Sequence, residues 1–196
     1  MSDAIDPEVR AEIGDAVQQA LVEHGYEGVT TAKIAAAYGT TEAALYYYFE
    51  SKDEMIAAFL DHLRGHLGER VVDRETDGPA EELRVACELL FLDPDDEAAP
   101  LHVAIMELLS HAPHNETLRE PLIRLESAML EELERIVREG VEAGVFREVD
   151  PRATAAFLLA AADGSTGFHT ALEMDVGADV ERGVAAYVDS LLAEQP

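Results

Sequence analysis

Hydroxyl side chains and the chain's only two lysines are concentrated in residues 28–52 of an acidic protein. Threonine and tyrosine hydroxyls can donate hydrogen bonds to phosphate oxygens without carrying a charge, and a lysine adds an ammonium group. A helix that begins near residue 52 would add its free N–H groups and the positive end of its dipole. These groups have the chemistry to bind an anionic backbone such as that of DNA. The candidate contacts are Thr30, Thr31, Lys33, Thr40, Thr41, Tyr46, Tyr47 and Lys52.

Two short helices separated by a glycine turn would position these groups. Thr30 and Thr31 can cap a helix that ends near Gly39, and Thr40 and Thr41 can cap the next helix. A helix-turn-helix motif requires such a pair, with apolar side chains of both helices packed inward. The inward positions are predicted to be Ile34, Ala35, Leu45 and Phe49.

The second helix of this pair has small side chains at its N-terminal end. Thr41, Ala43 and Ala44 leave it narrow enough to enter a DNA major groove, which is about 12 Å wide. Glu42 lies among them and has two interpretations. Its carboxylate can accept a hydrogen bond from a cytosine amino group, or it is a solvated acid at a helix N-terminus that meets no base. The tyrosines at 46–48 are consecutive, so they cannot all face a core.

The charge distribution sets this segment apart from the rest of the chain. The protein has 41 acidic and 14 basic side chains, and its net charge of −27 argues against nucleic-acid binding by the usual rule of a basic surface. Within residues 28–52, however, Glu42 and Glu50 are balanced by Lys33 and Lys52. The scarcity of lysine and the abundance of acidic side chains favour the interpretation that the protein is adapted to molar salt. There the Debye length is about 3 Å, so the repulsion among its acidic side chains is screened. The alternative is an acidic protein from an organism with ordinary intracellular salt.

Helical periodicity extends over nearly the whole sequence, and strand-like alternation is almost absent. We therefore expect an all-α fold of about nine helices. The first ends near His24, a fourth runs from Lys52 to about Arg70, and two long helices cover about 115–143 and 151–172. Asn115 or Thr117 can begin the first of these long helices.

The same residues resemble a known family. The pattern Thr-Thr-x-x-Ile-Ala, then Gly, then Leu-Tyr-x-Tyr-Phe-x-Ser-Lys-x-Glu-Met is similar to the DNA-binding domain of tetracycline-repressor-type (TetR) regulators. The preceding link, Gly25–Thr30, also matches, and the resemblance is strong over residues 10–60. Further along, Glu139-Gly140-x-x-x-Gly144-x-Phe146 and Asp163-Gly164 resemble the C-terminal halves of many members.

The resemblance implies a helix-turn-helix DNA-binding domain in residues 1–51 and a helical effector-binding and dimerisation domain in residues 52–196. It implies a homodimeric repressor that a small-molecule effector releases from a palindromic operator in double-stranded DNA. The DNA contacts that it implies, chiefly with the backbone, are Thr31, Thr41, Ala43, Tyr46, Tyr47 and Lys52.

The C-terminal helices carry candidates for the effector pocket and for the dimer. The pocket, for a small apolar or amphipathic effector, would be lined by Phe91, Met106, Leu109, Met129, Phe157 and Phe168. Each of these side chains is also compatible with an ordinary core. The dimer interface would contain Ala160, Ala161, Gly164, Leu172, Tyr187, Val188 and Leu191. The alternative is that this stripe packs only within its own chain.

Other functional classes have little support in the sequence. There is no nucleophile elbow, phosphate loop or zinc motif, so we expect neither an enzyme nor a cofactor nor a metal site. Asp163 with His169 is weak evidence for catalysis, and Cys87 is interpreted as a small core residue. A helical adaptor that has lost DNA binding remains the rival. Without a long apolar run or a basic N-terminus, we expect a cytoplasmic protein with no membrane contact.

Overall fold

The protein, described by a computed structural model over residues 6–65, 76–91 and 99–193, confirms the all-α prediction. These ranges contain nine α-helices and one 3-10 helix, and their only β-type pairing is an isolated bridge between Phe146 and Leu192. The helices are α1 (Pro7–Gly28), α2 (Thr31–Tyr38), α3 (Glu42–Leu45), α4 (Lys52–Gly65), α6 (Pro79–Leu90), α7 (Ala99–His111), the 3-10 helix η1 (Ala112–His114), α8 (Glu116–Glu142), α9 (Pro151–Leu172) and α10 (Gly177–Leu191). The end predicted for the fourth helix, near Arg70, lies outside the described residues.

The chain divides into two compact units. The first comprises residues 1–66 and 100–125, and the second comprises residues 67–99 and 126–196. The first unit therefore contains α1 to α4, nearly all of α7 and the start of α8. These units are defined by packing, and the functional division expected between residues 51 and 52 stays a prediction.

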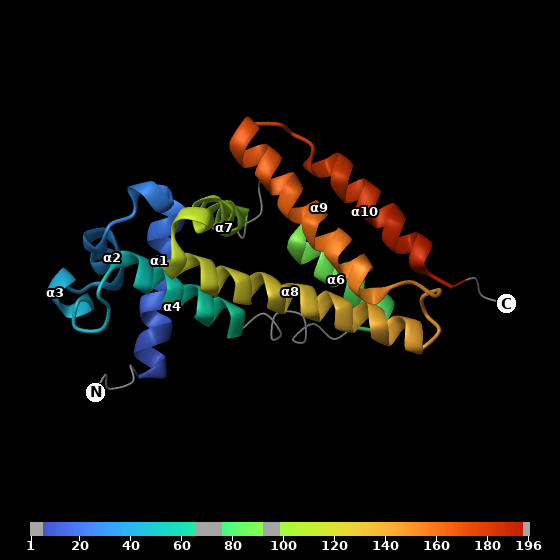
Figure 1. Cartoon of the computed structure of the whole chain (residues 1–196), viewed down its shortest axis with the longest axis horizontal. Coiled ribbons are helices and arrows are strands. Elements are labelled where there is room, and N and C mark those ends of the chain that lie inside the picture. The colour runs from blue at the N-terminus through green and yellow to red at the C-terminus, as the bar shows by residue number, and fades with distance from the viewer. Residues whose placement is uncertain (1–5, 66–75, 92–98, 194–196) are drawn as a thin grey trace. The chain divides into compact units, whose positions relative to one another are not determined.

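Residues of α1 supply the centre of the first unit. Ile13, Val17 and Leu21 recur at helical spacing and are fully buried, as the periodicity predicts. They lie on a helix that packs against α2 and α4 (Figure 1). Gly25 interrupts α1 with a φ of +66°, a conformation that glycine adopts without steric cost. The regular part of α1 thus ends close to His24, as predicted.

The start of α8 is fixed by the side chain of Asn115. Its amide oxygen accepts hydrogen bonds from the backbone N–H groups of Thr117 at 3.1 Å and Leu118 at 3.4 Å. Of the two starts that the sequence allowed, Asn115 is therefore the cap. The helix continues through Pro121, which is buried near its beginning.

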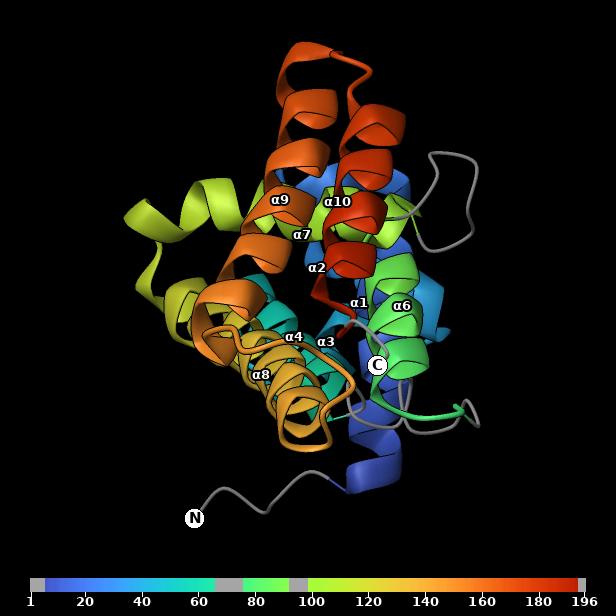
Figure 2. The same ribbon diagram turned by 90° about the vertical axis from the view of Figure 1, so that its right-hand side faces the viewer.

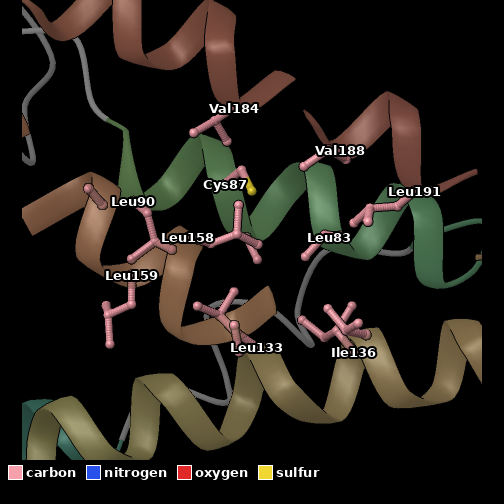
Figure 3. Packing of buried hydrophobic residues seen from close by; sticks show 14 of the residues in the cluster. Leu83, Cys87, Leu90, Leu133, Ile136, Leu158, Leu159, Val184, Val188 and Leu191 are labelled. Atoms are coloured by element: carbon pink, nitrogen blue, oxygen red, sulfur yellow. The ribbon is translucent and has the colours of Figure 1, made fainter. Parts of the chain in front are cut away.

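The second unit has a core built from four helices. Figure 3 shows that Leu83 and Cys87 of α6, Leu133 of α8, Leu158 of α9 and Val188 of α10 point toward one another. Burial of these side chains is the main stabilising contribution to this unit. It also raises the pKa of the Cys87 thiol to about 12, so this cysteine is a packing residue, as predicted.

A tight turn follows α8 and explains one of the glycines in the sequence pattern. Phe146 folds back over Gly140, and a Cβ at Gly140 would lie 2.1 Å from Cδ2 of the Phe146 ring. Gly144, with a φ of +69°, makes the turn between them. The spacing Gly140-x-x-x-Gly144-x-Phe146 is thus a helix end closed by an aromatic ring.

Helices α9 and α10 lie side by side in both views of the molecule (Figure 2). Val188 and Leu191 of α10, expected at a dimer surface, are instead buried in the core of their own unit. The stripe prediction was wrong for these two residues because their side of α10 faces α6 and α9. Tyr187 is half-buried, and its hydroxyl lies 3.4 Å from that of Thr154.

Candidate nucleic-acid interface

The turn between α2 and α3 is built by caps at both ends. The Thr30 hydroxyl accepts a hydrogen bond from the Lys33 N–H at 3.3 Å, which fixes the start of α2. Gly39 ends α2 with a φ of +77°, and the Thr40 N–H donates back to the Ala35 carbonyl at 2.8 Å. The Thr41 hydroxyl then accepts from the Ala44 N–H at 3.3 Å and starts α3. The sequence predicted a threonine cap for each helix and a stop near Gly39, and the structure selects Thr30 and Thr41 as the caps.

The side chains that were expected to face inward are buried, although α3 ends at Leu45 and Phe49 follows it rather than belonging to it. Ile34, Ala35, Leu45 and Phe49 are buried. The opposite side of α3 presents Thr41, Glu42, Ala43 and Ala44, all exposed. The second helix therefore carries a narrow, solvent-facing N-terminal end, which is the requirement for entry into a major groove.

The tyrosines that follow α3 extend this exposed surface. Tyr46 and Tyr47 are exposed, and Tyr48 lies against Tyr47 edge-to-face, with 5.0 Å between the ring centroids. Thr31, expected to touch DNA, is only 7% exposed. Its hydroxyl lies 3.2 Å from that of Tyr46, and the two share a hydrogen bond. Thr31 thus lies beneath the surface and orients the exposed Tyr46 through this hydrogen bond.

Both lysines use their ammonium groups within the protein. Lys33 Nζ donates to the Gly28 carbonyl at 2.7 Å. Lys52 Nζ donates to the carbonyls of Tyr26 at 3.0 Å and Val29 at 3.3 Å, and lies 4.4 Å from the centroid of the Tyr26 ring. A lysine has three N–H donors, so each ammonium retains at least one for another acceptor.

The start of α4 has a reciprocal cap. The Glu54 N–H donates to the Ser51 hydroxyl at 3.2 Å, and the Glu50 N–H donates to the Glu54 carboxylate at 2.8 Å. This arrangement resembles a capping box shifted by one residue, and it engages the carboxylate of Glu54 and the backbone N–H of Glu50. Glu42 has no such partner among the hydrogen bonds described, and it stays exposed in the first turn of α3.

A polar cluster beside this surface was not predicted from the sequence. Tyr26 donates its hydroxyl proton to Asp53 at 3.1 Å, and the Asn115 amide donates to Tyr26 at 3.1 Å and to Asp53 at 2.9 Å. Burial and the Asp53 carboxylate raise the pKa of Tyr26. The sequence indicated Asn115 only as one of two possible starts of a helix. No local pattern reports that residues so far apart in the sequence meet.

The residues predicted to line an effector pocket are distributed over both units. Met106 and Leu109 are half-buried in the first unit, whereas Phe91 and Met129 are half-buried against the core of the second. Phe157 and Phe168, also in the second unit, are about half exposed on α9. Phe91 borders a groove of about 220 Å³ between α6 and α10, with Cys87 and Val184 in its walls.

Two carboxylates of the second unit are withdrawn from solvent. Burial, with a contribution from Asp163, raises the pKa of Glu126 to about 7, and burial raises the pKa of Asp163 to about 6. Oε2 of Glu126 is buried and has no hydrogen-bond partner among the residues that the structure describes. A buried carboxylate that is not paired favours its neutral form.

Glu107 and His111 of α7 both contact Tyr26. The Glu107 carboxylate accepts from the Tyr26 N–H at 2.8 Å, and the His111 ring lies 4.5 Å from the Tyr26 ring. Within residues 6–65, 76–91 and 99–193, no three His, Cys, Asp or Glu side chains are grouped so that they could hold a metal ion. No helix in the same ranges is long and apolar enough to cross a membrane.

A helix-turn-helix with a small, exposed second helix, carried on an all-helical scaffold, defines a DNA-binding transcriptional regulator. Residues 13–59 match the family described as "Bacterial regulatory proteins, tetR family", and residues 79–193 match "BetI-type transcriptional repressor, C-terminal". The chain belongs to the TetR family. Because the members of this family are transcription regulators, the expectation that the protein is not an enzyme is confirmed.

Curated relatives include nucleoid occlusion factors. SlmA of Vibrio atlanticus (strain LGP32) is 31% identical over 163 residues, which cover 80% of this chain and 81% of that protein. SlmA of Pasteurella multocida (strain Pm70) is 51% identical over 49 residues, and this match spans only 25% of either chain.

Solved structures with a similar fold cover nearly the whole chain. A TetR transcription regulator from Haloarcula marismortui ATCC 43049 has a TM-score of 0.82 and 30% identity, covering 95% of this chain and 100% of that one. A putative regulator from Saccharomonospora viridis, crystallised in complex with choline, has a TM-score of 0.79 at 20% identity, covering 97% and 100% of the two chains. The second likeness is evidence for the fold alone.

Proposed function

We propose that the protein is a homodimeric repressor that binds a palindromic operator and leaves it when a small-molecule effector binds. The observation that carries this proposal is the exposed side of α3, where Thr41, Ala43 and Ala44 project from a helix whose other side is buried. Small side chains there let the helix approach base edges, and the flanking hydroxyls supply phosphate contacts.

The proposed contacts divide by their role. Thr41, Tyr46 and Tyr47 donate to phosphate oxygens, and further hydroxyls come from Thr40 in the turn between α2 and α3 and from Thr30 at the start of α2. Lys52 offers its remaining N–H to a phosphate while it holds the Tyr26 and Val29 carbonyls. The Lys33 ammonium donates one N–H to the Gly28 carbonyl, and its positive charge is proposed to attract the DNA backbone from that position. Ala43 contacts a base edge, and the two interpretations of Glu42 remain open.

A dimer is proposed because one helix-turn-helix reads too few bases for useful specificity. An apolar stripe on α9 supports it, with Phe157, Ala160, Gly164, Phe168 and Leu172 all exposed. Ala161 and Tyr187 lie half-buried beside it. Burying such a stripe against a second copy removes apolar surface from water, and its small residues permit close helix approach.

The effector is proposed to be small and apolar or amphipathic. The support is the half-buried apolar side chains of Phe91 and Met129 in the second unit, together with the choline bound by the regulator from Saccharomonospora viridis.

The acidic surface is proposed to be an adaptation to molar salt inside the cell. The net charge of −27 would oppose DNA binding in dilute buffer. At a Debye length of about 3 Å, only charges close to the DNA affect binding. Those charges belong to residues 28–52, whose acidic and basic side chains are equal in number.

Selection from random-sequence DNA in concentrated potassium chloride tests this function. We expect the purified protein to enrich a palindrome whose half-sites lie about 34–36 Å apart, one helical turn. Ala43→Glu, which adds bulk and charge to the exposed side of α3, should abolish the enrichment. Ala178→Glu makes the same change at an exposed position of α10 and should leave the enrichment unchanged. Failure of the folded wild-type protein to enrich any sequence would favour the adaptor interpretation.

A further inference from the structure

Three side chains from distant parts of the sequence form one hydrogen-bonded cluster in the first unit. The Asn115 amide nitrogen donates to the Tyr26 hydroxyl oxygen at 3.1 Å and to Asp53 Oδ2 at 2.9 Å. The Tyr26 hydroxyl donates to Asp53 Oδ1 at 3.1 Å. All three groups are partly buried, where hydrogen bonds of a charged acceptor are strong. The cluster joins the end of α1, the first turn of α4 and the residue that caps α8.

Helix α7 binds the other side of Tyr26. The Glu107 carboxylate accepts from the Tyr26 N–H at 2.8 Å, and the His111 ring lies 4.5 Å from the tyrosine ring. The neighbouring Gly25 has a φ of +66°, and a Cβ there would lie 2.9 Å from Glu107 Oε2. The glycine thus allows the carboxylate to reach the backbone. Tyr26 is held by α7 at its backbone and by the Asp53–Asn115 pair at its hydroxyl.

Tyr26 in turn determines where the ammonium of Lys52 lies. Lys52 Nζ donates to the Tyr26 carbonyl at 3.0 Å and lies 4.4 Å from the centroid of the ring, an arrangement that favours a cation. The same ammonium binds the Val29 carbonyl at 3.3 Å, in the link that leads into α2. A shift of Tyr26 would therefore move the lysine and release this link.

We infer that Tyr26, Asp53 and Asn115 form a latch through which α7 and the cap of α8 set the position of Lys52 and of the α1–α2 link. Asp53 and Asn115 are positioning residues, since they act on DNA affinity through Tyr26 and Lys52. Of the effector candidates on α7, Met106 directly precedes Glu107, and Leu109 lies two residues before His111. A displacement of α7 by an effector is thereby passed to the DNA-binding helices in one step. This regulatory role rests on the proposed DNA binding.

The substitution Asn115→Asp separates the latch from the helix cap. An aspartate caps α8 as well as asparagine does, but it cannot donate to Tyr26 or Asp53 and it places a second carboxylate beside the first. The double variant Asp53→Asn/Asn115→Asp reverses the pair and restores an amide-to-carboxylate hydrogen bond. Thr117→Asp is the matched control, because it adds the same charge to the first turn of α8 at an exposed position.

Hydrogen–deuterium exchange without DNA or effector is the first measurement. We expect Asn115→Asp to raise the exchange of the amides in residues 25–30 and 52–55 by about 10-fold, because local opening becomes easier. The double variant should recover most of the protection, and Thr117→Asp should match the wild type. Unchanged exchange in Asn115→Asp, for a folded protein, would overturn the latch.

Affinity for the selected DNA is the second measurement. We expect Asn115→Asp to lower it about 5- to 30-fold, with recovery in the double variant. Increased exchange with unchanged affinity would overturn the coupling to DNA. A wild-type protein that binds no DNA would overturn the proposed function and the coupling together, and exchange would still decide whether the latch exists.

Discussion

Tyr47 offers the most accessible test at the scale of single residues. Its side chain is 79% exposed beside α3, so little of the folding energy depends on it. If Tyr47 meets the DNA backbone, Tyr47→Ala should lower DNA affinity about 10-fold and Tyr47→Phe about 3-fold, since phenylalanine loses only the hydroxyl contact. Fluorescence anisotropy with the selected DNA measures both. Equal affinity of Tyr47→Ala and wild type would remove Tyr47 from the interface.

Glu126 makes stability depend on pH. Its pKa in the folded protein is raised to about 7, so between its ordinary pKa of 4.5 and that value the folded state keeps a proton that the unfolded state has lost. The free energy of unfolding should therefore fall as pH rises through this window. Glu126→Gln cannot ionise, and should be more stable than wild type at pH 8 by on the order of 1–3 kcal/mol, with little difference at pH 4.5.

Denaturant titrations at the two pH values measure this difference. Glu131→Gln, an exposed position on the same helix, is the control for the loss of one surface charge. A difference between Glu126→Gln and wild type that does not change with pH would contradict a buried, protonated Glu126.

At the scale of elements, the end of α8 depends on a glycine that the aromatic ring of Phe146 covers. A Cβ at Gly140 would lie 2.1 Å from that ring, so Gly140→Ala should destabilise the protein by about 1–3 kcal/mol through overpacking. Gly183→Ala, where a Cβ meets nothing within 4 Å in the middle of α10, is the matched control. It should stabilise the helix by about 0.5–1 kcal/mol. Thermal unfolding of both variants at one salt concentration measures the contrast, and similar melting temperatures would refute it.

Local signals predicted the elements well. Caps and stops act within one helical turn, so residue type and spacing identify the stop near Gly39 and narrow the caps to Thr40 or Thr41 and to Asn115 or Thr117. The buried positions of α1 and α2 follow from periodicity alone.

The failures came from contacts over long sequence distances. Periodicity identifies the apolar side of a helix but not what covers it, so Val188 and Leu191 were assigned to a dimer although they lie in their own core. Thr31 was expected to contact DNA because its hydroxyl can bind a phosphate and the family resemblance implies it, whereas the structure buries it behind Tyr46. The latch was missed because Tyr26, Asp53 and Asn115 meet only after folding.

At the scale of the whole molecule, the exposed stripe on α9 should decide whether the protein is a dimer. Leu172 is 61% exposed and Phe168 is exposed beside it, so neither contributes much to the fold of one chain. Phe168→Glu/Leu172→Glu should convert a dimer to a monomer, because two charges would be buried without partners. Val22→Glu, an exposed apolar position in the first unit, should leave the dimer intact. Light scattering after size-exclusion chromatography measures the mass, and a double variant that remains dimeric would show that the stripe is not the interface.

The central claim is that a protein with a net charge of −27 binds DNA through its balanced segment, residues 28–52. Binding of the purified protein to the DNA upstream of its own gene, titrated from about 0.1 M to above 2 M potassium chloride, tests it most directly. Ordinary regulators lose affinity steeply over this range, because each neutralised phosphate adds about −0.9 to the log–log slope. We predict specific, saturable binding of a dimer that persists at high salt. No specific binding at any salt, by protein shown to be folded, to this DNA or to any sequence from the random selection, would contradict the account.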